Sequence, residues 1–264
     1  MEFFGKIINF LDYRIETPTP YGAFHIVSLI LLILVCFLIV LNSSKISEKI
    51  YRKVILFSWI TIVILELYKQ FNFSFSYEEN KVVFDYQWYA FPYQFCSTPQ
   101  YVLPFIAFAK NDKIYYPCVA YIMTYSLFAG LGVMAYPGTI YVETLLINVQ
   151  TTIHHGLQVV LGVLTACVYK DKLRDLSFFL KGIWVFLIAL FIALTLNLIA
   201  PLITKETFNM FFISPYFECT LPILSSIKPN VWYPLFLLIY TLGFTLVSLA
   251  VYEILSLLLK RKKS

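Results

Sequence analysis

The side chains best suited to covalent chemistry in this sequence are one cysteine, Cys96, and two adjacent histidines, His154 and His155. A thiol becomes an effective nucleophile when a nearby base or cation favours its thiolate form, and imidazole is the usual base. Burial favours the neutral, proton-accepting form of imidazole, which suits that role. These residue types predict nucleophilic catalysis if the fold brings the thiol to one of the two rings.

The histidines belong to a polar stripe on an otherwise apolar segment at 144–169. The stripe has seven polar side chains within eleven residues: Asn148, Gln150, Thr151, Thr152, His154, His155 and Gln158. On a helix they fall within an arc of about 200°, opposite an apolar face. Ionisable side chains inside a bilayer cost about 2–3 kcal/mol or more each, so the stripe indicates a functional pocket. The alternative is that these side chains only form packing hydrogen bonds with neighbouring helices.

Composition assigns the chain to a membrane. Hydrophobic residues make up 60% of the 264 residues, charged residues make up 13%, and the mean hydropathy is +0.77. A chain this apolar does not fold as a soluble domain. We therefore predict an all-α integral membrane protein, a bundle of transmembrane helices forming a single polytopic domain over residues 1–264, in a bacterial cytoplasmic membrane.

Seven apolar stretches approach the length of about 20 residues that crosses the hydrocarbon of a bilayer. The predicted helices lie at about 22–42, 53–71, 91–109, 114–135, 145–169, 177–200 and 232–258. The third is expected to break or kink, because Pro92, Pro99 and Pro104 each remove a helical donor. The backbone groups released in such a segment can line a polar cavity.

Basic residues alternate between the predicted loops. Fourteen fall on one side, four at 45–53, two at 110–113, four at 170–181 and four at 260–263, and five fall on the other, namely Lys6, Arg14, Lys81, Lys205 and Lys228. The positive-inside rule then places the N-terminus outside and the C-terminus in the cytoplasm, which requires an odd number of helices. The net charge of +5 is explained by a cytoplasmic rim that contacts anionic lipid headgroups, so no nucleic-acid partner is needed.

With this orientation, polar side chains gather in the outer half of the bundle: His25 in the first helix, Glu66 and Lys69 in the second, Gln94 and Cys96 in the third, Asn197 in the sixth. At 1.5 Å per residue, Cys96 lies about 9 Å deep and His155 about 15 Å deep, so the two can meet if their helices adjoin. Two simpler interpretations stay open. Glu66 and Lys69 could merely neutralise each other, and His25 could be an interfacial side chain.

Cys96 could also be chemically inert. The segment 92–99 and the segment 215–222 share the spacing Pro-Tyr-x-x-Cys-Ser/Thr-x-Pro. Both are predicted to face the outside, where disulfides persist, so a bridge between Cys96 and Cys219 is a rival to any thiol mechanism.

Several short strings resemble the YwaF-type family of bacterial integral membrane proteins, which is related to transmembrane protein 164. The main one is Phe91-Pro92-Tyr93-Gln94-Phe95-Cys96-Ser97, followed by Pro104. The others are Phe24-His25, Glu66 with Lys69, Gln150 to Gly156, Leu196-Asn197, Asn209-Met210-Phe211-Phe212 and Trp232-Tyr233-Pro234. They occur in the family's order and span most of the chain.

The resemblance implies a membrane acyltransferase with a cysteine and a histidine, which fall on Cys96 and His155. We expect CoA-independent transfer of an acyl chain from a phospholipid to a lysophospholipid in the outer leaflet. Cys96 would form a thioester, with His155 as base and then acid. The substrate-binding or orienting residues would be His25, Glu66, Lys69, Gln94, Asn148, Thr152, His154 and Asn197, and helix-start amides near Cys96 would stabilise the oxyanion. No cofactor or metal is expected.

Three other functions fit the residues. A lipid esterase or lipase would use the same pair of side chains with water as acceptor. A zinc hydrolase would have to draw three ligands from His25, His154, His155, Cys96 and Glu66. A transporter or receptor of seven helices would use the polar stripe as a binding pocket. The lipid specificity and the oligomeric state are not encoded in any pattern that we recognise.

Overall fold

The computed structural model describes residues 2–138, 140–204 and 206–259. Its helices and strands are α1 (Glu2–Leu11), α2 (Ala23–Asn42), α3 (Glu48–Asn72), β1 (Phe75–Glu78), β2 (Lys81–Phe84), α4 (Pro99–Phe108), α5 (Asp112–Tyr121), α6 (Leu127–Ala135), α7 (Leu145–Val168), α8 (Leu176–Thr204), α9 (Leu224–Ile227) and α10 (Tyr233–Leu259). A π-helical turn at Ile122–Ser126 joins α5 to α6. The described chain is thus mostly helical.

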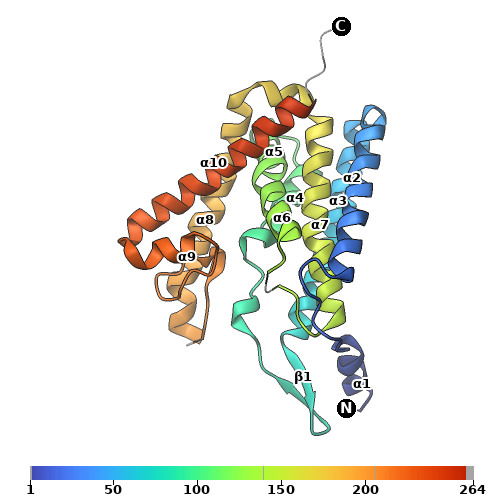
Figure 1. The fold of residues 1–264 in the computed structure, drawn as a ribbon, viewed down its shortest axis with the longest axis vertical. Coiled ribbons are helices and arrows are strands. Elements are labelled where there is room, and N and C mark those ends of the chain that lie inside the picture. The colour runs from blue at the N-terminus through green and yellow to red at the C-terminus, as the bar shows by residue number, and fades with distance from the viewer. Residues whose placement is uncertain (1, 139, 205, 260–264) are drawn as a thin grey trace.

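The long helices run roughly along one axis, with α7 at the centre (Figure 1). α7 packs against α2, α3 and α6, while α5 packs against α8. α1 and the last turn of α10 lie at opposite ends of the bundle, and α10 slants away from α7 toward the lower left of the view (Figure 1). We call the end that carries α1, β1 and β2 the hairpin end. The loops that follow α3, α6 and α8 all return at this end.

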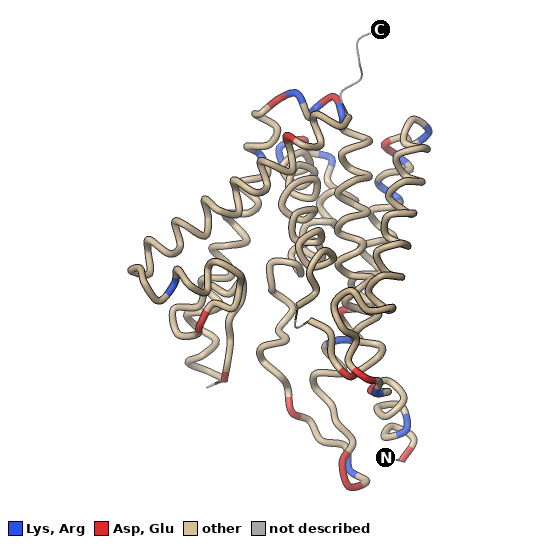
Figure 2. Tube along the Cα trace, in the orientation of Figure 1, with Lys and Arg blue, Asp and Glu red and all other residues tan. Residues whose placement is uncertain are grey.

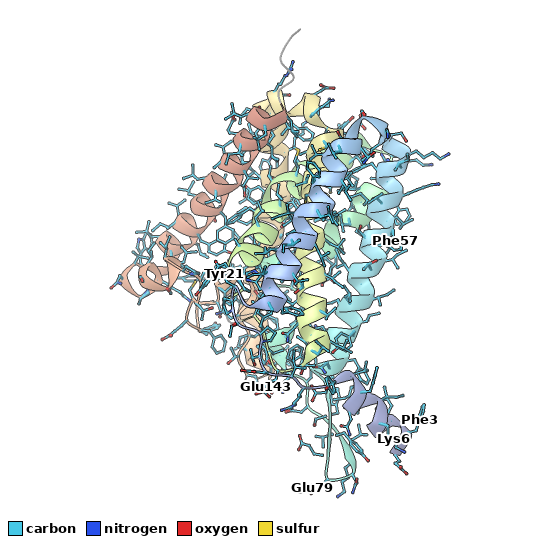
Figure 3. The ribbon with its side chains drawn as sticks, turned by 45° about the vertical axis from the view of Figure 1, so that its right-hand side comes forward. Phe3, Lys6, Tyr21, Phe57, Glu79 and Glu143 are labelled. Carbon is cyan, nitrogen blue, oxygen red and sulfur yellow. The ribbon has the colours of Figure 1, made fainter. Side chains whose placement is uncertain are left out.

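Five helices of the described residues are long and apolar enough to cross a membrane: Ala23–Lys45, Asp112–Ala135, Leu145–Val168, Leu176–Thr204 and Tyr233–Leu259. Apolar side chains cover the outside of the bundle; Phe57, for example, projects outward from α3 and is 72% exposed (Figure 3). Burying such a surface in lipid removes the cost of exposing it to water. The structure therefore confirms an all-α architecture with membrane-length helices.

The third predicted helix differs from the expectation. An α-helix was predicted at about 91–109, whereas α4 covers only Pro99–Phe108. The preceding residues form an extended chain with a 3-10 turn at Phe95–Ser97. Pro99 takes the first turn of α4, where its missing N–H costs nothing, and its ring would clash with the carbonyl four residues earlier if the helix extended backward. The segment with Cys96 is therefore irregular backbone held inside the protein.

Charged residues gather at the two ends of the bundle, with few between them (Figure 2). The basic groups at 45–53 and 170–181 lie at the end away from the hairpin, as the alternation of loops predicts (Figures 1 and 2). The basic tail at 260–263 and Lys205 lie outside the described residues. The hairpin itself turns at Glu79 and Asn80, both with positive φ, as a tight type I′ turn requires.

Close contact between α6 and α7 depends on a glycine and provides a test of the packing. A Cβ atom at Gly130 would meet the Gln158 Cβ and the His155 carbonyl oxygen at 2.8 Å each, whereas one at Gly132 on the same helix has nothing within 4 Å. We expect the free energy of unfolding of Gly130→Ala to be about 1–3 kcal/mol lower than that of Gly132→Ala, because overpacking at residue 130 outweighs the gain in helix propensity. Thermal unfolding of the two variants in detergent measures this difference, and equal stability would contradict the packing.

Candidate functional site

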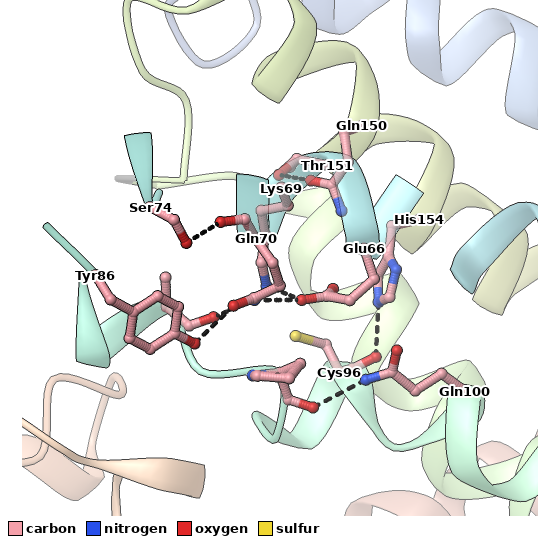
Figure 4. A network of polar contacts seen from close by, with 12 residues as sticks. Glu66, Lys69, Gln70, Ser74, Tyr86, Cys96, Gln100, Gln150, Thr151 and His154 are labelled. Carbon is pink, nitrogen blue, oxygen red and sulfur yellow. Dashed lines mark hydrogen bonds and ion pairs between the residues drawn. The ribbon is translucent and has the colours of Figure 1, made fainter. Parts of the chain in front are cut away.

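Cys96 is held in place by two side chains of α7. Its carbonyl oxygen accepts one hydrogen bond from His154 Nε2 at 2.9 Å (Figure 4) and another from Gln158 Nε2 at 2.9 Å. The two donors are one helical turn apart and so share a face of α7. Gln100 steadies the same irregular segment by donating to the Pro92 carbonyl at 2.8 Å. The position of the cysteine is thus set by contacts with the backbone of its own segment.

The contact with Cys96 also fixes the tautomer of His154. A carbonyl oxygen only accepts, so Nε2 carries the hydrogen, and in the neutral ring Nδ1 then holds the lone pair. His154 Nδ1 is buried and has no hydrogen-bond partner within the part of the chain that the structure describes. By the same reasoning His155 donates from Nδ1 to the Thr151 carbonyl at 2.8 Å, and its Nε2 holds the lone pair. The structure therefore brings His154, and not His155, into direct contact with residue 96.

A chain of polar side chains runs from α3 toward the surface of the hairpin end. Glu66 Oε1 accepts from Lys69 Nζ at 2.8 Å and from Gln70 Nε2 at 2.7 Å. Gln70 Oε1 accepts in turn from the Tyr86 hydroxyl at 2.6 Å. Burial, aided by the Glu66 carboxylate, raises the pKa of the Tyr86 phenol, so this group stays a donor. Gln70 thereby orients the carboxylate of Glu66.

The thiol of Cys96 lies on the side of Glu66 and Lys69 (Figure 4). A cation near a thiol stabilises the thiolate, and a carboxylate can receive its proton. The thiol, the ion pair and the imidazole thus form one cluster between α3, α7 and the segment before α4.

Three buried atoms of this cluster lack a hydrogen-bond partner among the residues that the structure describes: Glu66 Oε2, His154 Nδ1 and Gln158 Oε1. We call them the acceptor cluster, because each can only accept: Gln158 donates from Nε2 to the Cys96 carbonyl, so its remaining polar atom is the oxygen. Glu66 is 5% exposed, His154 3% and Gln158 fully buried. Buried polar atoms in native proteins are normally paired, so this concentration indicates a place for a ligand or water.

His25, predicted to bind or orient a substrate, connects two backbone segments. Its Nδ1 accepts from the Tyr21 N–H at 2.9 Å, and its Nε2 donates to the Met134 carbonyl at 2.9 Å. Both ring nitrogens are thereby used, and the residue is fully buried. His25 joins the start of α2 to the end of α6 and is separate from the cluster at Cys96.

Three amide side chains that were predicted to bind or orient a substrate make the same kind of structural contact. Each pairs with the backbone of a loop through both its oxygen and its nitrogen, as a strand neighbour would. Asn148 pairs with Val142 N and O, Asn197 with Met210 N and O, and Gln94 with Phe211 N and Asn209 O. These contacts anchor the loops at the hairpin end to the helices, which makes the three residues supports of the site.

Thr152 lies apart from the acceptor cluster. It precedes His154 by two positions and therefore points about 200° away around α7. Its hydroxyl is buried without a hydrogen-bond partner in the described chain. Thr152 is therefore a suitable control position for substitutions in the acceptor cluster.

The rival interpretations of Cys96 can be compared with the structure. All five cysteines lie within the described residues, and each is a free thiol, so the predicted rival bridge from Cys96 to Cys219 is not formed. Within residues 2–138, 140–204 and 206–259, no three His, Cys, Asp or Glu side chains lie close enough together to hold a metal ion.

Sequence reasoning included Gln158 only as a member of the polar stripe, without a role of its own, and assigned no role to Gln70 and Tyr86. Gln158 lies one helical turn after His154, and Gln70 lies one turn after Glu66. A glutamine four residues after an ionisable side chain shares its helix face, and this spacing could have identified both residues. Tyr86 follows the hairpin, and no pattern in its neighbourhood indicates the contact with Gln70.

Comparisons with known proteins add no relative. No family model matches the chain, and neither the curated proteins nor the solved structures include a significant match.

Proposed function

We propose that this protein is a membrane-embedded acyltransferase that moves an acyl chain from a phospholipid to a lysophospholipid hydroxyl without CoA. The observation that carries the proposal is the buried cluster in which Cys96, fixed through its carbonyl by His154 and Gln158, lies beside the ion pair of Glu66 and Lys69. It combines a nucleophile, two proton acceptors and a cation within a bundle of membrane-length helices.

In the first half of the reaction the donor lipid loses its acyl chain. The Cys96 thiol gives its proton to Glu66 Oε2, and the thiolate attacks the ester carbonyl. As the tetrahedral intermediate collapses, the bond between the acyl carbon and the lipid oxygen breaks. That oxygen receives the proton from Glu66 and leaves as the lysolipid hydroxyl, with the acyl chain held as a thioester on Cys96.

In the second half the acceptor lipid takes the chain. His154 Nδ1 removes the proton of the acceptor hydroxyl, whose oxygen attacks the thioester. The bond to the Cys96 sulfur breaks, and the proton on His154 returns to the thiolate. On this geometry His154 replaces the predicted His155 as the base, since His154 is the ring that contacts residue 96.

Lys69 is the group best placed to stabilise the oxyanion. The backbone amides of Ser97 and Thr98, which helix-start reasoning favoured, already donate to the Gln94 and Phe95 carbonyls. The Lys69 ammonium uses one hydrogen on Glu66 and has others to offer, and it lies on the same side of the segment as the Cys96 thiol (Figure 4). A cation is an effective partner for charge that develops in a water-poor site.

The proposal includes the orientation of the chain, with seven crossings, the hairpin end outside and the C-terminus in the cytoplasm. We expect a peptide tag inserted between Glu79 and Asn80 to be labelled by antibody on intact spheroplasts, because the positive-inside rule places that turn outside. A tag at the C-terminus should be labelled only after permeabilisation. The reverse pattern would invert the orientation and place the site in the inner leaflet.

Acyl exchange in proteoliposomes tests the function. We expect purified protein to move a labelled acyl chain from a phospholipid to an added lysophospholipid, and Cys96→Ala to abolish that transfer, because no other group forms the thioester. Cys219→Ala is the matched control, since Cys219 has the same local spacing but forms no part of the cluster. Transfer at the wild-type rate by Cys96→Ala, or release of free fatty acid that ignores the lysolipid, would refute acyl transfer through this residue.

A further inference from the structure

The acceptor cluster also restricts which lipid can take the acyl chain. We infer that the acyl acceptor is a lysolipid whose headgroup ends in an uncharged, hydroxyl-rich group such as glycerol, and that Glu66 Oε2, His154 Nδ1 and Gln158 Oε1 accept hydrogen bonds from the hydroxyls of that group. The inference rests on the proposed function and names the substrate class of the same site.

The first step is the hydrogen-bonding character of the cluster. Within the described chain, Glu66 Oε2, His154 Nδ1 and Gln158 Oε1 have no hydrogen-bond partner, and all three atoms are acceptors. The nearby amide and imidazole donors are already used, because His154 Nε2 and Gln158 Nε2 hold the Cys96 carbonyl and Gln70 Nε2 holds Glu66 and the Ala90 carbonyl. The remaining hydrogens of the Lys69 ammonium are assigned to the oxyanion of the reacting ester. A complementary ligand must therefore supply several donors.

The second step is charge. Glu66 and Lys69 form an ion pair at 2.8 Å, with side chains 7% and 18% exposed. The rings of His154 and His155 each donate from one nitrogen and hold a lone pair on the other, so both are neutral. The cluster as a whole is neutral. A ligand that brought a net charge into it would lose hydration without gaining an opposite charge in return.

These two conditions separate the common headgroups. A phosphate only accepts, so it would face three acceptors and belongs outside the cluster. Choline has a charge and no N–H or O–H to donate. Ethanolamine donates, but its ammonium would approach the Lys69 ammonium. Glycerol and other polyols donate through several hydroxyls and carry no charge, which fits the cluster on both counts.

The experiment compares three lysolipids that share one acyl chain and carry glycerol, choline or ethanolamine beyond the phosphate. Binding is measured with the Cys96→Ala protein in nanodiscs, as the rise in its unfolding temperature with ligand concentration, and acyl transfer is measured with the wild type in proteoliposomes. We expect the glycerol probe to bind at least about tenfold more tightly than the choline probe, as two or more gained hydrogen bonds permit. Transfer should follow the same order.

Two variants of α7 test whether the acceptor cluster causes the preference for the glycerol probe. Gln158→Met keeps the length of the side chain and removes the acceptor, while His154 still holds the Cys96 carbonyl. We expect it to lose most of the preference for glycerol and to bind the choline probe as before. Thr152→Val removes a hydroxyl on another face of α7 and should keep the preference.

The outcomes separate this inference from the proposed function. Equal binding of glycerol and choline probes, or a preference for ethanolamine, overturns the inference even if acyl transfer is observed. A glycerol preference that Gln158→Met retains also overturns it, because the selectivity then lies elsewhere. Glycerol-selective binding that Gln158→Met abolishes, in a protein that transfers no acyl chain, supports the site and refutes the transferase.

Discussion

His154→Ala is expected to lower the rate of acyl transfer by about 10²- to 10⁴-fold, the range that a general base contributes. The change removes the base that takes the acceptor proton, and it removes one of the two donors that hold the Cys96 carbonyl at 2.9 Å. Single-turnover measurements distinguish the two losses. Formation of the thioester should slow only modestly, because Gln158 still holds the carbonyl, whereas transfer to the lysolipid should slow by the full factor.

His155→Ala is the matched comparison, since the two residues are adjacent and similarly buried. His155 donates to the Thr151 carbonyl of its own helix, a contact that α7 can lose without moving Cys96. We expect a reduction below about tenfold, as removal of a residue outside the reacting groups produces. A larger loss for His155→Ala than for His154→Ala would return the role of base to His155, where the sequence analysis placed it.

Much of the fold follows from hydropathy. The predicted helices at 22–42 and 145–169 correspond to α2 and α7, because a run of apolar residues long enough to cross lipid must satisfy its backbone internally. The segment at 91–109 could not be predicted in detail. The prolines indicate that a helix breaks, but where the backbone goes afterwards depends on contacts with α7 that lie about sixty residues away in the chain.

The candidate site could be predicted only as a region. The alternation of basic loops and the depth along each helix placed the polar stripe of α7 and the pair Glu66 and Lys69 in the outer half of the bundle. The structure joins His154 and the ion pair in one cluster around Cys96 (Figure 4). Spacing could not tell a ligand-facing amide from a structural one. Asn148 and Asn197 were expected near substrate, yet both pair with loop backbone, since an amide side chain matches a peptide group in shape and in hydrogen bonding.

Asn197→Leu tests this structural interpretation and is expected to have the largest effect on stability. Asn197 is fully buried and pairs with Met210 N at 2.7 Å and Met210 O at 2.8 Å. Leucine has nearly the same size but leaves both backbone groups unpaired, at a cost of about 1–3 kcal/mol each. We therefore expect the free energy of unfolding to fall by about 2–5 kcal/mol, and thermal unfolding in detergent measures this.

Asn42→Leu provides the control, because Asn42 is exposed and donates a single hydrogen bond within the last turn of α2. It should change stability by less than about 0.5 kcal/mol, as is usual for surface positions. Loss of the pairing between Asn197 and Met210 should also loosen the segment that holds Cys96. Gln94 pairs with the same loop at Phe211 and directly precedes the turn that carries Cys96. Limited proteolysis should therefore cut at 205–209 sooner than in the control, and Cys96 should react faster with maleimide. If Asn197→Leu unfolds at the temperature of Asn42→Leu, the pairing with Met210 contributes nothing, and Asn197 becomes available again for a role in binding.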